Sequence, residues 1–137
     1  MDGIPNRLSY ALLMHLPHSQ DMDIGALGTI HFEKGWYVYV GSGTEKRIER
    51  HFRKEKKNHW HIDYFLQRAE PVRAYRYDKG ECSLAKSFEG LEQLPLGASD
   101  CRCRGHLFHG TLQKIEDLVL THGPIEELGP ESRLTGK

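Results

Sequence analysis

Three side chains that can handle anions and protons follow one another around a glycine-containing turn. Tyr39 lies near the end of the aromatic and β-branched run WYVYVG, and the turn at 41–43 breaks that run. Arg47 and His51 follow in a charged segment, where residues four apart lie on the same side of a helix. A phenol, a guanidinium and an imidazole around one cleft can bind an anion and move a proton. The alternative is packing alone, because tyrosines on half-buried strands usually bond their hydroxyls to the backbone.

Positive charge gathers directly after this turn, although the chain as a whole carries none. Lysine and arginine together number 19, as do aspartate and glutamate. Between residues 45 and 57 the bases are Lys46, Arg47, Arg50, Arg53, Lys54, Lys56 and Lys57, against Glu45, Glu49 and Glu55. Such a basic edge is typical of a surface that binds phosphates. A solvated helix with interleaved Glu and Lys gives the same pattern and is the alternative.

The segment HWHIDY holds a second group of titratable residues. His59 and Asp63 are four apart and share one side of the expected helix, whereas His61 lies on another side. The segment alone therefore does not supply three ligands for one metal ion. His59 or His61 can contact a phosphate from this position, or they orient the loop and pack Trp60.

A cluster of zinc-competent side chains lies further along the chain. Its members are Cys101, Cys103, His106 and His109. The Cys-x-Cys spacing is tighter than the usual spacing of structural zinc sites. The alternative is a turn leading into a strand whose Leu107 and Phe108 fill the core.

Length, cysteine usage and hydropathy narrow the class of protein. The 137 residues fit one domain, which we place at 1–122, followed by a flexible tail at 123–137. The three cysteines form an odd set without an even disulfide framework, which favours a reducing compartment. No apolar run approaches the ~20 residues that cross a bilayer, and the N-terminus lacks the stretch of a signal peptide. We therefore expect a cytoplasmic protein with no membrane partner.

The strands that would position these side chains follow from apolar alternation. Residues 8–16, LSYALLMHL, are apolar on both alternating faces, which indicates a central strand. Residues 29–32 and 36–41 flank a short turn and predict a hairpin. Tyr37, Tyr39 and Gly41 would share one face of its second strand, and Trp36, Val38 and Val40 the other. Residues 72–77, VRAYRY, predict a further strand.

Helical spacing predicts the elements around this sheet. A helix capped by Thr44 carries Ile48 and Phe52 toward the core, and a second helix ends before Pro71. A third is expected over 81–91 and a short one near 112–120. We therefore predict an α+β fold. It has a small, mostly antiparallel sheet of three or more strands, built from residues near 8–16, 27–41 and 72–77 and flanked by three or more helices.

The sequence resembles the GIY-YIG nuclease superfamily at several of these positions. Tyr39-Val40-Gly41, followed by Arg47 and His51, is similar to the second half of the family's signature. Ser9-Tyr10 would stand for the first triad, although it reads Leu-Ser-Tyr, and Glu81 in GECSLA resembles the family's metal-binding glutamate. No match is evident for the asparagine found near the end of many members. The segments GWYVYVGSG, RIERH, HWHIDYFL, ECSLA and SDCRCRGHLF resemble the Uri-type branch of small prokaryotic stand-alone proteins over most of the chain.

The resemblance implies a metal-dependent endonuclease that hydrolyses phosphodiester bonds of DNA or another nucleic acid. Glu81 would hold one Mg²⁺ or Mn²⁺, with waters completing its shell. Arg47 would grip the non-bridging phosphate oxygens. Tyr39 or Tyr10 would position and deprotonate the attacking water, and His51 would share that proton transfer. Without the resemblance, Glu81 simply begins a helix and Arg47 is a solvated arginine.

On this interpretation the nucleic acid also contacts residues outside the catalytic set. These are Arg50, Lys54, Lys57, Ser42, His59 and His61. The variant first triad leaves open a catalytically inactive nucleic-acid-binding module of the same fold. The cysteine and histidine cluster leaves open a zinc-stabilised interaction protein.

Overall fold

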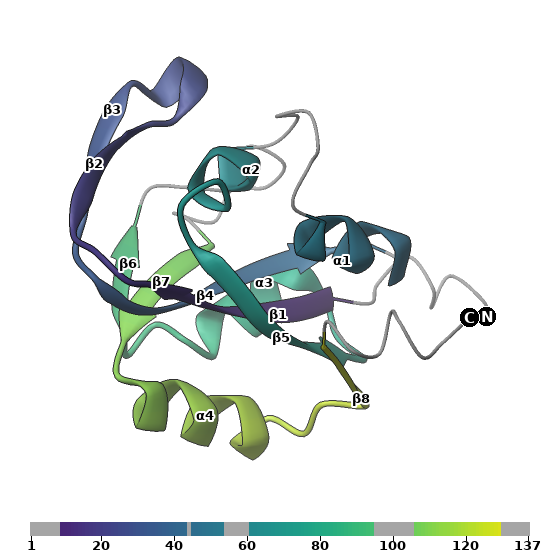
Figure 1. Cartoon of the computed structure of the whole chain (residues 1–137). Coiled ribbons are helices and arrows are strands. Elements are labelled where there is room, and N and C mark those ends of the chain that lie inside the picture. Colours follow the sequence, from purple (N-terminus) through teal and green to yellow (C-terminus); the bar gives the residue numbers. More distant parts are fainter. Residues whose placement is uncertain (1–8, 44, 54–60, 95–105, 130–137) are drawn as a thin grey trace.

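A six-stranded antiparallel sheet carries the fold in the computed structural model, which describes residues 9–43, 45–53, 61–94 and 106–129 (Figure 1). The strand order is β6-β7-β4-β1-β5-β8. The strands are β1 (Ser9–Leu16), β4 (Gly35–Ser42), β5 (Glu70–Tyr77), β6 (Glu92–Leu94), β7 (Leu107–Gly110) and β8 (Glu126–Leu128). Four helices flank the sheet: α1 (Glu45–Phe52), α2 (His61–Phe65), α3 (Glu81–Lys86) and α4 (Leu112–Thr121). The predicted α+β class is confirmed.

Strand β1 is central and buried on both faces, as its apolar alternation predicts. Tyr10, Leu12 and Met14 pack with α1, α2 and the segment 22–32 on one face. Ala11 and Leu13 pack with α3 and α4 on the other face. Figure 1 shows α1 and α2 on one side of the sheet and α4 on the opposite side. The sheet therefore separates two apolar clusters, and β1 contributes to both.

The alternation predicted for β4 is also observed. Tyr37 and Tyr39 lie in the cluster on the α1 side, whereas Val38 and Val40 lie in the cluster with α3 and α4. The strand pairs with β1 along its whole length, from Leu16 opposite Gly35 to Ser9 opposite Ser42. This register places the turn after β4 beside the start of β1.

The predicted hairpin of 29–32 with 36–41 is wrong. Strand β3 (Thr29–Phe32) pairs instead with β2 (Gln20–Asp23) in a separate two-stranded ribbon. Gly35, at φ 135°, redirects the chain between β3 and β4. The ribbon packs Phe32 against Phe65 of α2, with ring centroids 4.9 Å apart. Since β4 is apolar on both faces, it is buried between β1 and β7 rather than paired at the edge with β3.

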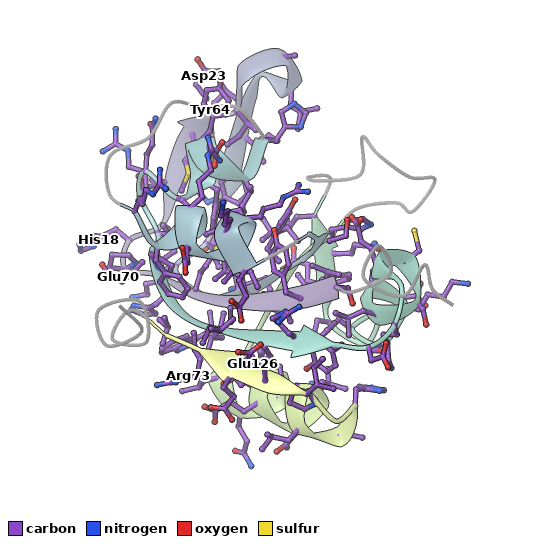
Figure 2. The ribbon with its side chains drawn as sticks, turned by 90° about the vertical axis from the view of Figure 1, so that its right-hand side faces the viewer. His18, Asp23, Tyr64, Glu70, Arg73 and Glu126 are labelled. Carbon is purple, nitrogen blue, oxygen red and sulfur yellow. The ribbon has the colours of Figure 1, made fainter. Side chains whose placement is uncertain are left out.

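The ribbon projects beyond the main sheet beside α2 (Figure 1). Its tip, a short 3₁₀ helix at Gly25–Leu27, contacts Tyr64. Figure 2 shows Tyr64 close to Asp23 at this end of the molecule.

Strand β8 lies within the segment predicted to be a flexible tail, 123–137. It pairs with β5, and Arg76 Nη1 donates to Glu126 Oε1 at 2.6 Å. Figure 2 shows Glu126 on this strand. The ion pair and the half-buried Leu128 explain why residues 126–128 join the sheet. Residues 130–137 lie outside the described part of the chain.

One cysteine forms a disulfide, which the sequence did not lead us to expect. Cys82, the second residue of α3, is disulfide-bonded. The other two cysteines of the chain, Cys101 and Cys103, lie outside the described residues. The expectation that the odd cysteine set carries no disulfide is therefore wrong for Cys82. Separately, no helix in the described part of the chain is long and apolar enough to cross a membrane.

A buried ion pair joins α1 to α2. Arg50 Nη1 donates to both carboxylate oxygens of Asp63 at 2.9 Å. The Asp63 side chain is fully buried and that of Arg50 is 19% exposed. A buried carboxylate requires such a partner, because removing it from water is costly.

We expect Asp63→Ala to lower the free energy of unfolding by about 3–5 kcal/mol, because it removes the carboxylate from a largely buried guanidinium. Urea denaturation followed by circular dichroism measures the loss. The matched control replaces both partners, as Arg50→Met with Asp63→Leu, and should cost much less. Equal losses in the single and double variants would contradict this account.

On the exposed face of the ribbon, His31 bridges two carboxylates. Its Nδ1 lies 2.7 Å from Asp21 Oδ1 and its Nε2 lies 2.7 Å from Glu33 Oε2. The hydrogen bond with Asp21 makes the largest contribution to raising the pKa of His31, and the hydrogen bond with Glu33 adds to it. The protonated ring donates to both acceptors at once, which a neutral ring cannot do.

We expect an NMR titration to give His31 a pKa above its ordinary value of about 6.5. A raised pKa in the folded state means that the bridge stabilises the ribbon fully below that ordinary value. The contribution is lost as the pH rises through the folded-state pKa. Asp21→Asn should move the pKa of His31 back toward the ordinary value. An unchanged titration curve in that variant would contradict the bridge.

Candidate active site

The candidate site lies at one end of the sheet, where two helices begin on opposite faces. Strands β4 and β5 both run antiparallel to β1, so both end beside its first residues. Helix α1 begins shortly after β4, and α3 shortly after β5. Helix α1 covers one face and α3 the other. Side chains from both faces therefore meet around this end of the sheet.

Two tyrosines and a histidine form the buried part of the site. Tyr10 Oη lies 2.6 Å from His51 Nε2, a hydrogen bond between β1 and α1. The Tyr39 ring lies 6.4 Å from the Tyr10 ring and 6.0 Å from that of His51, between centroids. Tyr10 and His51 are fully buried and Tyr39 is 3% exposed. Tyr39 and His51, which sequence spacing associated, therefore lie in one cluster with Tyr10, which the family resemblance added.

Gly41 makes this close packing sterically feasible. It lies directly opposite Tyr10 in the pairing of β1 with β4. A Cβ at this position would lie 2.6 Å from Tyr10 Oη and 3.1 Å from Tyr39 Cε2. Because real Cβ atoms do not approach other atoms so closely, a side chain here would displace the Tyr10 hydroxyl.

Arg47 folds back over the turn between β4 and α1. Its Nη1 donates to the carbonyl oxygen of Ser42 at 2.7 Å. Its guanidinium also bonds the side chain of Tyr10. The positive charge therefore lies beside the phenol, between the two faces of the sheet.

Burial dominates the acid–base behaviour of Tyr10. Burial raises its pKa well above the ordinary value, and the nearby Tyr39 and Glu81 add to that rise. The Arg47 charge and its hydrogen bond act in the opposite direction but do not cancel the rise. Tyr10 is therefore a neutral phenol at physiological pH in this arrangement.

Glu81 supplies the negative charge of the site from the first turn of α3. His106 Nδ1 lies 2.5 Å from Glu81 Oε2, and the Ser42 hydroxyl also bonds the carboxylate. Burial disfavours ionisation of Glu81. The hydrogen bond and charge of His106, with Ser42 and Arg47, outweigh that effect and lower its pKa. Glu81 is therefore an ionised carboxylate at neutral pH, with 17% of its side chain exposed.

His106 is a site residue that the sequence did not reveal in this role. It precedes β7, and its carbonyl accepts a hydrogen bond from the Val40 backbone N–H at 2.8 Å. Its position beside Glu81 depends on the pairing of β7 with β4. No pattern in the sequence fixes the register between two strands as far apart in the chain as β4 and β7.

The structure brings together six of the predicted site residues. They are Tyr10, Tyr39, Ser42, Arg47, His51 and Glu81. Arg50, predicted to bind nucleic acid, forms an ion pair with the buried carboxylate of Asp63. His61 is half-buried at the start of α2. The predicted residues Lys54, Lys57, His59, Cys101 and Cys103 lie outside the described part of the chain.

The proposed zinc cluster does not fit the two histidines that are described. His106 contacts Glu81 at the start of α3, whereas His109 pairs with Glu92 and stacks on Tyr37. Tyr37 and α3 lie on opposite faces of the sheet. One zinc ion therefore cannot take both histidines as ligands.

A divalent cation held by one carboxylate fits the site better. Within the described ranges, no group of three or more His, Cys, Asp or Glu side chains could hold a metal ion. Mg²⁺ is commonly bound by one or two carboxylates, waters and substrate phosphates. Ser9, directly opposite Ser42, is buried with no hydrogen-bond partner for its hydroxyl in the described chain. A hydrated ion at Glu81 would bring water, and hence a hydrogen-bond partner, to this end of β1.

Fold and site together define an α+β protein with a tyrosine, arginine, histidine and glutamate cluster at one end of an antiparallel sheet. The chain belongs to the family described as domain of unknown function DUF123, which matches residues 9–124. Comparison with curated proteins and with solved structures found no match.

We expect Gly41→Ala to lower the free energy of unfolding by about 1–3 kcal/mol, because overpacking forces Tyr10 and Tyr39 apart. Thermal and urea denaturation measure this loss. Gly90→Ala is the matched control, since a Cβ there meets no atom within 4 Å. Equal stability of the two variants would contradict the close approach at Gly41.

Proposed function

We propose that this protein is a metal-dependent endonuclease of GIY-YIG type, related to the Uri branch, that hydrolyses phosphodiester bonds of DNA or another nucleic acid in the cytoplasm. The observation that supports the proposal most is the meeting of Tyr10, Tyr39, Arg47, His51 and Glu81 at one end of the sheet. These residues come from β1, β4, α1 and α3, so no local sequence feature accounts for their proximity. Each has a role in phosphodiester hydrolysis.

Arg47 would bind the scissile phosphate. Its guanidinium has several donors in a planar fork that matches phosphate oxygens. One of these donors now bonds the Ser42 carbonyl, and another part of the group bonds Tyr10. A phosphate would replace these contacts with charge-assisted hydrogen bonds, which are stronger than neutral ones.

Tyr10 and His51 would move the proton of the attacking water. A phenol with a raised pKa is a poor base, so it needs an acceptor for its own proton. His51 Nε2 is that acceptor at 2.6 Å. The water proton passes to Tyr10 Oη as the phenolic proton passes to His51, and the imidazolium holds the transferred charge. Tyr10 is fully buried and bonded to Arg47, so water reaches it only after Arg47 turns toward a phosphate.

Glu81 would hold the divalent ion, since it is ionised and lies next to the Arg47 charge. Mg²⁺ or Mn²⁺ bound there supplies charge stabilisation for the developing phosphorane and for the leaving oxygen. Tyr39, in ring contact with His51, is placed to orient the same water or phosphate.

A nucleic-acid-binding module of the same fold, without catalysis, is the second candidate. The full burial of Tyr10 favours it, because an inaccessible phenol cannot take a proton from water. Such a module would retain the Arg47 contact to phosphate and its salt dependence.

We expect the protein to nick plasmid or branched DNA in the presence of Mg²⁺ or Mn²⁺. Arg47→Ala and Glu81→Gln should each lower the cleavage rate by about 100-fold or more, the typical cost of losing one group that stabilises transition-state charge. Gel assays with purified variants measure the rates. Lys46→Ala and Glu89→Gln are the matched controls, since both residues are exposed neighbours on α1 and near α3.

The two candidates give different outcomes in this assay. Salt-sensitive DNA binding by the wild-type protein, without cleavage under either metal, would support the binding module. Cleavage that survives Glu81→Gln unchanged would contradict the role assigned to the carboxylate. Absence of both binding and cleavage would remove DNA as the partner.

A further inference from the structure

We infer that His106 is a positioning residue for Glu81, which fixes the carboxylate in the orientation that binds a divalent cation. The inference rests on the proposed function only in taking Glu81 as the metal-binding group. The sequence placed His106 in a possible zinc cluster with Cys101, Cys103 and His109, and not beside Glu81.

The contact itself is short and shielded from solvent. His106 Nδ1 lies 2.5 Å from Glu81 Oε2, and the imidazole is fully buried. A fully buried ring does not reach a substrate or a bulk water, so its action must pass through the groups that it contacts. Its imidazole contacts the carboxylate assigned to the metal.

His106 is itself held firmly by the central part of the sheet. Its carbonyl accepts from the Val40 N–H at 2.8 Å, and the chain then enters β7, which pairs with β4. Val40 is fully buried between β1 and β7. The backbone of His106 is therefore hydrogen-bonded to a central strand directly before β7, whereas Glu81 lies in the first turn of a six-residue helix.

A glutamate side chain loses considerable rotamer freedom when it is fixed in one orientation. Because His106 and Ser42 already contact Glu81, this loss of entropy occurs when the protein folds and not when a cation binds. Because a carboxylate offers about four lone-pair sites, the contact to Oε2 leaves acceptor capacity for a cation. Residues that orient a metal ligand in this way typically contribute 10–100-fold to metal affinity.

The test is Mn²⁺ binding, measured by electron paramagnetic resonance and by isothermal titration calorimetry on the full chain without nucleic acid. Wild-type protein should bind one ion, and Glu81→Gln should abolish binding. His106→Ala should weaken binding by about 10–100-fold. His106→Asn should restore most of the affinity, because an asparagine amide can donate to Oε2 from a similar position.

His109→Ala is the matched control, since His109 lies on β7 but contacts Glu92 on the other face of the sheet. It should bind Mn²⁺ as the wild type does. Thermal denaturation of each variant separates a loss of fold from a loss of positioning. If His106→Ala does not fold, the Mn²⁺ affinity of His106→Asn still tests the positioning role.

The outcomes distinguish this inference from the proposed function. Wild-type affinity in His106→Ala, or no recovery in a folded His106→Asn, would overturn the positioning role and leave the nuclease proposal intact. The predicted order of affinities without DNA cleavage would support the positioning role and count against the nuclease. Absence of Mn²⁺ binding by the wild-type protein would overturn the positioning role and the metal assignment together.

Discussion

The close approach of β1 to β4 at Gly41 is the constraint on which the candidate site depends. With no Cβ at that position, the Tyr10 hydroxyl lies against the neighbouring strand and reaches His51 of α1. This hydrogen bond connects the central strand to the helix that carries Arg47. Any side chain at Gly41 would move the phenol, and α1 would lose the hydrogen bond from His51 to the central strand. The glycine therefore controls both the packing and the geometry of the hydrogen bond between Tyr10 and His51.

The site also depends on the way in which the sheet ends. Tyr10, Tyr39 and His51 belong to the face covered by α1, whereas Glu81 and His106 belong to the face covered by α3. Arg47 and the Ser42 backbone lie between these groups at the strand terminus. A site around a sheet end can separate the Tyr10–His51 hydrogen bond from the Glu81 carboxylate, with the Arg47 guanidinium close to both.

Local patterns predicted the parts of the fold that depend on neighbouring residues. Alternation in WYVYV gave the two faces of β4, and the spacing of Ile48 and Phe52 gave the buried side of α1. The pairing partners were not predictable in the same way. Short strands such as β2, β6 and β8 acquire their conformation from distant partners, and their sequences carry little alternation of their own.

The same difference applies to the candidate site. Tyr39, Arg47 and His51 follow from spacing within one segment, and the family resemblance added Tyr10 and Glu81. His106 depends on the register of β7 against β4, which only the folded chain determines. Arg50 illustrates the reverse case, because its sequence context indicated a solvent-facing base. The buried Asp63 on the next helix recruits it instead.

The ion pair of Arg50 with Asp63 has a further thermodynamic consequence. Each phosphate neutralised by a protein cation releases counterions, and the slope of log affinity against log salt is about −0.9 per neutralised phosphate on duplex DNA. A guanidinium already neutralised by a buried carboxylate releases no counterion. Counting the bases of α1 from the sequence therefore overestimates the ionic-strength sensitivity of a complex with a polyanion. The gap between the expected and the measured salt dependence shows how much of the positive charge on α1 is already neutralised within the folded protein.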